Sequence, residues 1–141
     1  MKLSAKTEYA CLAVLELARA YETNEPVRIR NIAAEHGIPS RFLVQILLQL
    51  KGAGLVQSTR GAAGGYQLIK APDEITLGEV MAVIDGLQEL PNPNTSKAAA
   101  RRALRRAWRD VLVAEQQMLS ELTFAELARR ATGELESMYH I

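Results

Sequence analysis

The sequence has 141 residues, of which 48% are hydrophobic, 23% are charged and 5% are aromatic. This composition is typical of a globular protein, and the length suffices for one domain or for a small domain with an accessory element. No apolar run approaches the roughly 20 residues of a membrane-spanning helix, so we expect no membrane segment. The single cysteine, Cys11, excludes an intramolecular disulfide. Without a recognisable signal peptide, a cytoplasmic location is expected.

The net charge of +1 conceals an uneven distribution. Residues 1–70 carry nine basic and five acidic side chains, whereas residues 71–141 carry eight basic and eleven acidic ones. This asymmetry suggests that the first half faces a polyanion and the second half has another role. A chance fluctuation is the alternative.

Three helices are expected in the first part of the chain. Apolar residues recur at helical spacing over residues 4–19, with Ser4 as the N-cap. A short helix is expected over about residues 30–35, ended by Gly37, and a longer one from about Ser40 to residue 52. A short helix, a tight turn and a longer helix form the helix-turn-helix arrangement.

A β-hairpin is expected directly after the third helix. Residues 55–58 and 66–69 show the partial alternation of short strands, and three glycines between them supply the conformational freedom that a hairpin tip needs. Arg60 lies at the base of this tip, where a cation reaches a phosphate or the minor groove. A helix-turn-helix followed by such a hairpin predicts a winged helix.

Two alternatives to a DNA-binding wing stay open at this point. A glycine-rich loop can bind nucleotide phosphate, but the lysine and hydroxyl residue of a P-loop are missing, since Tyr66-Gln67-Leu68 follows the last glycine. The hairpin can also be purely structural, because turns commonly use glycine.

The wing sequence RGAAGGYQL, residues 60–68, resembles the Arg-Gly-x-x-Gly-Gly-Tyr-x-Leu motif of the Rrf-two family of bacterial regulators. Further similarity lies in residues 1–10, 37–39, 42–47 and 50–56. The family includes regulators of iron–sulfur biogenesis, of the nitric-oxide response and of cysteine metabolism. The resemblance implies a mainly α fold with a small β-hairpin and a function as a DNA-binding repressor, not an enzyme.

The same resemblance divides the chain. It implies a winged helix-turn-helix DNA-binding domain over residues 1–72 and a dimerisation and regulatory region over residues 73–141. Symmetric binding of double-stranded DNA by a homodimer follows as an expectation.

The resemblance also assigns DNA contacts. The expected DNA-binding residues are Lys6, Ser40, Arg41, Gln45, Lys51, Arg60, Gly61, Gly64 and Gly65. Ser40, Arg41 and Gln45 occupy the positions that face the major groove in the family. Several members have a glutamate where this chain has Val44. Valine offers only apolar contact, for instance to a thymine methyl group, so the operator is expected to differ.

The second half is expected to contain three helices. They are predicted over residues 76–85, about 97–122 and 123–131, with a loop over residues 91–96. The long helix would measure roughly 35–40 Å, and one small domain cannot bury its apolar stripe along that length. We therefore expect dimerisation through Leu104, Trp108, Val111 and Leu119. Five arginines off the stripe indicate a solvated face, or else a second nucleic-acid surface.

No cofactor or metal site is expected. Cluster-binding relatives carry three cysteines in the loop before the long helix, whereas residues 88–96 contain none. Cys11 is interpreted as a buried structural residue. His36 and His140 are too far apart in sequence to suggest a metal site, and no catalytic arrangement stands out.

The last residues, Tyr139, His140 and Ile141, suggest a protein partner. In the context of this family, peptides that end in an isoleucine carboxylate are ligands of the cysteine synthase active site. This favours the cluster-free members that act in cysteine metabolism. The alternatives are a frayed tail, or a regulatory protein that acts through this tail and not through DNA.

Overall fold

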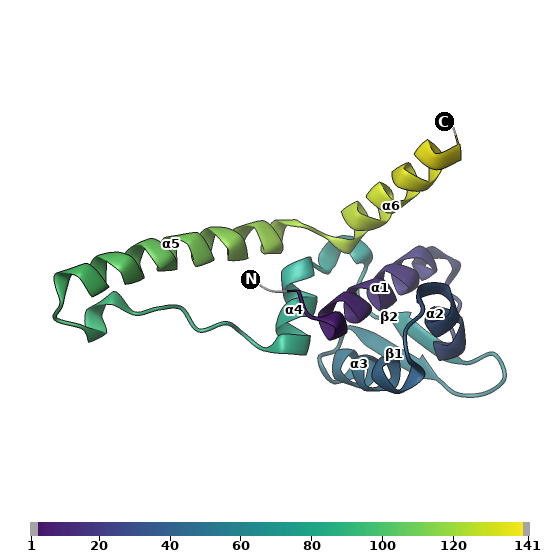
Figure 1. Ribbon diagram of the computed structural model, residues 1–141. Helices are drawn as coiled ribbons and strands as arrows, with labels where there is room; N and C mark the ends of the chain where they lie inside the picture. Colours follow the sequence, from purple (N-terminus) through teal and green to yellow (C-terminus); the bar gives the residue numbers. More distant parts are fainter. Residues whose placement is uncertain (1–2, 140–141) are drawn as a thin grey trace.

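The structure is a computed structural model that describes residues 3–139. The first half contains α1 (Ala5–Arg19), η1 (Tyr21–Thr23), α2 (Ile29–His36), α3 (Ser40–Gly52), β1 (Val56–Thr59) and β2 (Gly65–Leu68). The second half contains η2 (Pro72–Glu74), α4 (Leu77–Asp85), η3 (Pro93–Thr95), α5 (Ala99–Glu121) and α6 (Phe124–Tyr139). Figure 1 shows a compact unit from which α5 extends as a long arm. The expected class, mainly α with a small hairpin, is confirmed.

Local signals in the sequence set the helix ends. The Ser4 hydroxyl accepts a hydrogen bond from the Thr7 amide at the start of α1, and the Thr76 hydroxyl caps α4 in the same way. Gly37 ends α2 with a φ of 64°, a conformation that favours glycine. Pro39, not Ser40, is the N-cap of α3. Ser40 is therefore the first helical residue.

The hairpin is antiparallel, with Val56 opposite Leu68 and Thr59 opposite Gly65. Both strands are shifted by one residue from the expected ranges. The hairpin is tied to the segment before α2, because Val27 and Tyr66 exchange two backbone hydrogen bonds of 2.9 and 2.8 Å. A Cβ on Gly65 would lie 2.4 Å from the Val27 carbonyl oxygen, so this close approach requires glycine.

One hydrophobic core holds the compact unit together, and it does not stop at residue 72. Its members from the first half come from α1, α2, α3 and both strands. Ile75, Val80, Ile84 and Phe124 belong to the same core. Helix α4 and the first turn of α6 therefore pack with the helix-turn-helix.

The α5 arm is built differently. Leu112 is its one buried residue among those described. Arg105 donates to the Asn92 carbonyl oxygen over 3.3 Å, and Arg109 donates to the Pro91 carbonyl oxygen over 3.2 Å. These bonds hold the preceding segment against the helix. Two of the five arginines thus contact the protein's own backbone and are not purely solvated.

A short backbone bridge joins the arm to the compact unit. Thr76 and Thr123 pair in antiparallel fashion, with hydrogen bonds from the Leu77 amide to the Leu122 carbonyl and from the Phe124 amide to the Ile75 carbonyl. This bridge places Phe124 in the core and starts α6 against α1.

The prediction that the final helix ends at Ala131 is wrong. Helix α6 continues to Tyr139, and from Arg129 onward it projects away from the core with every described residue exposed. Gly133 does not interrupt it, because the surrounding Ala, Glu, Leu and Met residues are good helix formers that offset one glycine. None of the helices within residues 3–139 is long and apolar enough to cross a membrane.

Candidate nucleic-acid interface

Helix α3 has a buried face and an exposed face. Its buried side chains, Leu43, Ile46, Leu47 and Leu50, are fully inaccessible. Ser40, Arg41, Val44 and Gln45 are exposed. The helix is thus anchored by its leucines and isoleucine, while its exposed face carries two hydrogen-bonding side chains and one cation, which are groups that can read base edges in a major groove.

An aromatic chain positions Arg41. The Arg41 guanidinium carbon lies 5.1 Å from the centre of the Phe42 ring, and that ring lies 6.5 Å from the Tyr9 ring of α1. A cation over an aromatic face is held in place while its N–H groups stay available. Sequence reasoning missed this support, although Phe42 beside Arg41 is the signal that could have suggested it.

The wing lies beside α3 and is fixed to it. The Lys51 ammonium donates to the Ser58 hydroxyl of β1 over 2.8 Å. Arg60 and Gly61 are exposed in the loop beyond, where Gly61 has a φ of 107°. Lys6 is half-buried in the first turn of α1. The exposed cations of α3 and the wing are therefore parts of one connected surface.

Gly64 and Gly65 have structural reasons to be glycine. Gly64 is buried, and a Cβ there would lie 2.2 Å from the Thr59 carbonyl oxygen. A Cβ on Gly65 would likewise clash with the Val27 carbonyl group. A DNA contact through their backbones stays a prediction.

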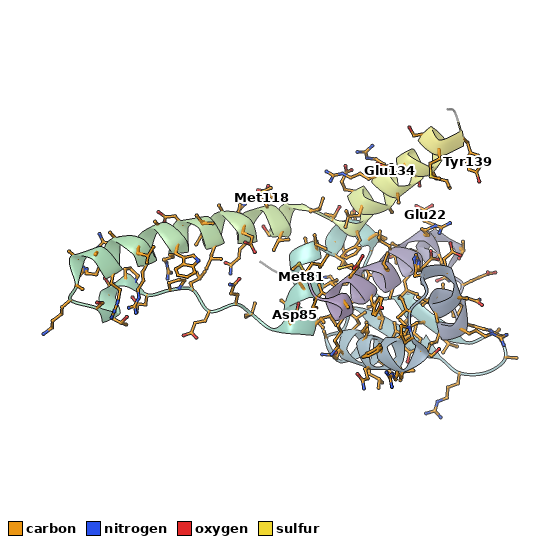
Figure 2. All side chains as sticks on the ribbon, viewed as in Figure 1. Glu22, Met81, Asp85, Met118, Glu134 and Tyr139 are labelled. Atoms are coloured by element: carbon orange, nitrogen blue, oxygen red, sulfur yellow. The ribbon has the colours of Figure 1, made fainter. Side chains whose placement is uncertain are left out.

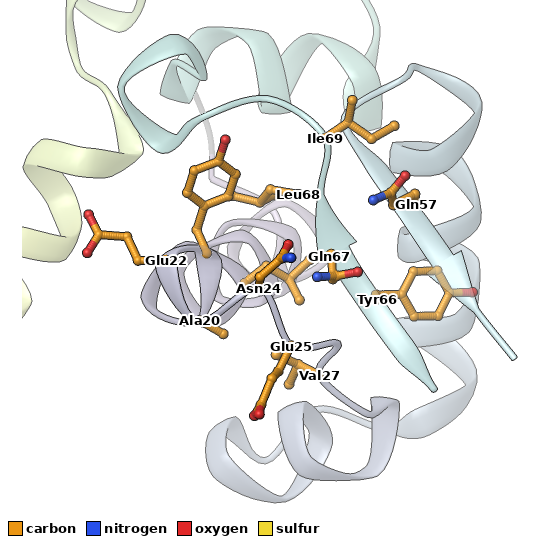
Figure 3. A pocket seen from close by; sticks show the side chains of 12 residues that line it. Ala20, Glu22, Asn24, Glu25, Val27, Gln57, Tyr66, Gln67, Leu68 and Ile69 are labelled. Carbon is orange, nitrogen blue, oxygen red and sulfur yellow. The ribbon is translucent and has the colours of Figure 1, made fainter. Parts of the chain in front are cut away.

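The side of the hairpin that faces away from α3 is unsuited to DNA. A hollow of about 390 Å³ lies between η1 and β2, and Figure 3 shows Gln57 and Gln67 among its lining side chains. Glu22 and Glu25 also line it. Two carboxylates repel phosphate. Of the two faces of the hairpin, the one beside α3 therefore stays the candidate for DNA binding.

An apolar row runs along α5 outside the compact unit. Leu104, Trp108, Val111 and Met118 are exposed by 60, 56, 63 and 73%, at positions that share one helix face. Met118 lies at the outer edge of α5 in Figure 2. Leu119, expected on the same stripe, instead contacts Gly78 of α4 in its own chain. The exposed apolar row of α5 therefore does not include Leu119, which lies on the same helix face as Trp108 but is partly covered by α4 of its own chain.

A family model described as an iron-dependent transcriptional regulator, Rrf2, matches residues 3–130. The chain belongs to the Rrf2 family. The HTH-type transcriptional regulator CymR of Bacillus subtilis is 33% identical over 142 aligned positions, which cover all of both chains. The resemblance inferred from the wing motif is thus confirmed, and members of this family are DNA-binding transcriptional regulators, not enzymes.

Solved structures of the Rrf2 family share the fold. The structure of CymR, the global cysteine regulator of Bacillus subtilis, superposes with a TM-score of 0.78 at 30% identity and covers 92% of this chain and 98% of that one. The structure of IscR of T. potens also gives a TM-score of 0.78 at 30% identity, covering 93% and 88%. The winged helix and its appended long helix are therefore those of the Rrf2 family.

The iron dependence in the description of the Rrf2 family has no matching ligand set among residues 3–139. No group of three or more His, Cys, Asp or Glu side chains in this range is arranged to hold a metal ion. Burial raises the pKa of the Cys11 thiol to about 11, with further contributions from Asp85 and Glu8. A single cysteine cannot supply the several thiolates that an iron–sulfur cluster needs. The side chains of the described residues therefore do not form the ligand set of a cluster.

Proposed function

We propose that this Rrf2 regulator is a repressor that binds its operator as a homodimer in the cytoplasm, without an iron–sulfur cluster. The proposal rests on the presence of two distinct surfaces in the same chain. A connected face of α3 and the wing presents Ser40, Arg41, Gln45 and Arg60, while α5 exposes an apolar row that its own chain leaves uncovered. The first surface suits DNA, and the second suits a second copy.

The spacing of the α5 row supports pairing of two helices. Leu104, Trp108, Val111 and Met118 follow one another at intervals of four, three and seven residues, which is the heptad pattern of a coiled-coil seam. A tryptophan and three aliphatic side chains on one helix form a larger apolar surface than the single exposed residues that monomers carry. A twofold dimer would cover this row with the same row of the partner.

The regulated process is proposed to be cysteine or sulfur metabolism. The support is the relative CymR, whose structure is described as that of a global cysteine regulator, and its full-length similarity to this chain. The cysteine-free loop before α5 agrees with a signal other than a cluster.

Binding to DNA is tested by gel shift on the promoter of the chain's own gene over a range of salt concentrations. We expect Arg60→Ala to weaken binding and to lower the salt slope by about one per protomer, because one phosphate contact is lost. Arg106→Ala, which removes an exposed cation from α5, is the control and should leave both quantities unchanged. No retardation of any promoter fragment at low salt would overturn the proposal.

A second candidate function is docking of the C-terminal end into a protein partner, proposed to be cysteine synthase. The end of α6 favours it, since Leu135, Met138 and Tyr139 are exposed by 51, 70 and 81%. His140 and Ile141 lie outside the described residues. A carboxylate-binding site recognises a free chain end through backbone N–H groups. Equal retention of the intact chain and of a chain without Ile141 on immobilised cysteine synthase would reject this role.

A further inference from the structure

The exposed face of α3 carries two aliphatic side chains that neither the fold nor the proposed hydrogen-bonding contacts use. Val44 is exposed by 40% and Leu48 by 55%. The remaining leucines and the isoleucine of α3 are fully buried. Single exposed aliphatic residues are common on protein surfaces. Here the two lie one helical turn apart on the surface that is presented to DNA.

The surroundings of this pair favour DNA over a protein partner. Arg41, Val44, Gln45 and Leu48 have the spacing of one helix face, so the aliphatic side chains alternate with a cation and an amide. Lys51 follows on α3, and Arg60 lies in the wing beside it. A protein interface typically centres on an apolar patch depleted in charge, whereas this pair is bracketed by cations that suit phosphates.

The major groove offers one apolar group for such side chains. The C5 methyl group of thymine projects into it, and no other base of unmodified DNA has an equivalent. Four residues of an α-helix span about 6 Å, which corresponds to roughly two base-pair steps of B-DNA. We propose that Val44 and Leu48 read two thymine methyl groups, at most about two base pairs apart, in each half-site. This inference rests on the proposed function, since it assumes that α3 enters the major groove.

The proposal makes Leu48 a specificity-determining residue, in addition to Val44. Arg41 and Gln45 would select bases by hydrogen bonds, whereas Val44 and Leu48 would select thymine by excluding water from its methyl group. A preference of this kind depends on the methyl group and not on the Watson–Crick pair. The methyl group can therefore be removed from the DNA, and the preference tested, without a change in base pairing.

The experiment replaces thymine by deoxyuridine, which lacks only this methyl group. Duplexes are first selected from a random library with the wild-type protein at fixed salt. Each thymine of the selected site is then replaced singly, and the dissociation constant is measured by fluorescence anisotropy. At two thymines per half-site, we expect the replacement to lower the affinity of the protein for the duplex roughly fourfold, the effect of about one buried methyl group. All other thymines should tolerate the change.

Protein variants assign each methyl group to a side chain. Val44→Ala should abolish the uracil penalty at one thymine, and Leu48→Ala should abolish it at the other. Both side chains are substantially exposed, so the variants should fold, which helical circular dichroism verifies. Ile69→Ala is the control, because Ile69 is also exposed by 50% but lies outside α3. It should leave both penalties intact.

The outcomes separate this inference from the proposed function. If a specific site is selected but tolerates uracil at every thymine, or if the penalties persist in both α3 variants, the inference is overturned and operator binding stands. If no sequence is enriched and wild-type protein binds all duplexes equally, both are overturned.

Discussion

The compact unit buries most of its apolar side chains, whereas the α5 arm leaves most of its apolar side chains exposed. Of the hydrophobic side chains that are buried in the described residues, Leu112 alone belongs to α5, and all others belong to the compact unit. The compact unit therefore gains its stability within one chain. The arm has hydrogen bonds to its own preceding segment but leaves its apolar row to solvent. The compact unit buries its apolar side chains within one chain, whereas the arm would bury its apolar row only in the proposed dimer.

The largest expected effect concerns the point where the arm returns to the compact unit. Phe124 is fully buried, and Phe124→Ala should lower the free energy of unfolding by about 3–5 kcal/mol through lost burial and a cavity. Leu135→Ala, in the projecting part of α6, should change it by less than about 0.5 kcal/mol. Urea titrations of both variants measure the difference. Equal losses of unfolding free energy in the two variants would contradict the division of α6 into a buried first turn and an exposed remainder.

A smaller effect is expected on self-association. Trp108→Ala should weaken the proposed dimer by at least about 30-fold, the usual cost of losing a central tryptophan. Val111→Ala and Val113→Ala form a matched pair, because Val113 is exposed by 46% on the other side of the same helix. Only Val111→Ala should weaken association in sedimentation equilibrium. Similar association of both valine variants would contradict pairing through the apolar row.

A local effect is expected in the segment that precedes α5. Arg105→Ala removes the hydrogen bonds that the guanidinium donates to the Asn92 carbonyl and the Thr95 hydroxyl. With a net loss of at least about 1 kcal/mol, amide hydrogen exchange over residues 92–98 should speed up by roughly fivefold or more. Arg106→Ala is the control, since Arg106 makes no such bond within residues 3–139. Unchanged exchange in Arg105→Ala would show that the segment is held by other contacts.

The smallest expected effect is a pH dependence at the start of α6. Hydrogen bonds from Arg129 and Arg130 lower the pKa of Glu126 to about 2. The carboxylate therefore stabilises the first turn of α6 above pH 4.5, and this contribution is lost as the pH falls toward 2. NMR titration of the Glu126 carboxyl carbon reports the midpoint directly. Glu126→Gln should remove the helicity change in this pH range, and a midpoint near 4.5 in the wild type would contradict the ion pairs.

Much of the compact unit could be predicted from the sequence because its signals are local. Ser4, Gly37 and Thr76 mark helix ends through side-chain caps or backbone conformation, and the structure agrees within one or two residues. The wing could be predicted from its glycines and its motif. The exposed face of α3 follows from the same periodicity that buries its leucines.

The remaining features depend on partners without a sequence signature. Arg105 and Arg109 contact backbone carbonyls, which every residue type carries. Leu119 and Trp108 both fit an apolar stripe, and only the position of α4 decides that Leu119 contacts its own chain. Gly133 resembles a helix end, but the helix formers around it carry α6 to Tyr139.

The Thr76–Thr123 bridge has a geometric consequence for operator architecture. Its two hydrogen bonds, of 2.8 and 2.9 Å, fix the direction in which α5 leaves the compact unit. In a symmetric pair joined through α5, that direction sets the distance between the two copies of α3, and thus the number of base pairs between half-sites. In the proposed dimer, a change in this bridge would change which operator spacing fits, with every expected DNA contact unchanged.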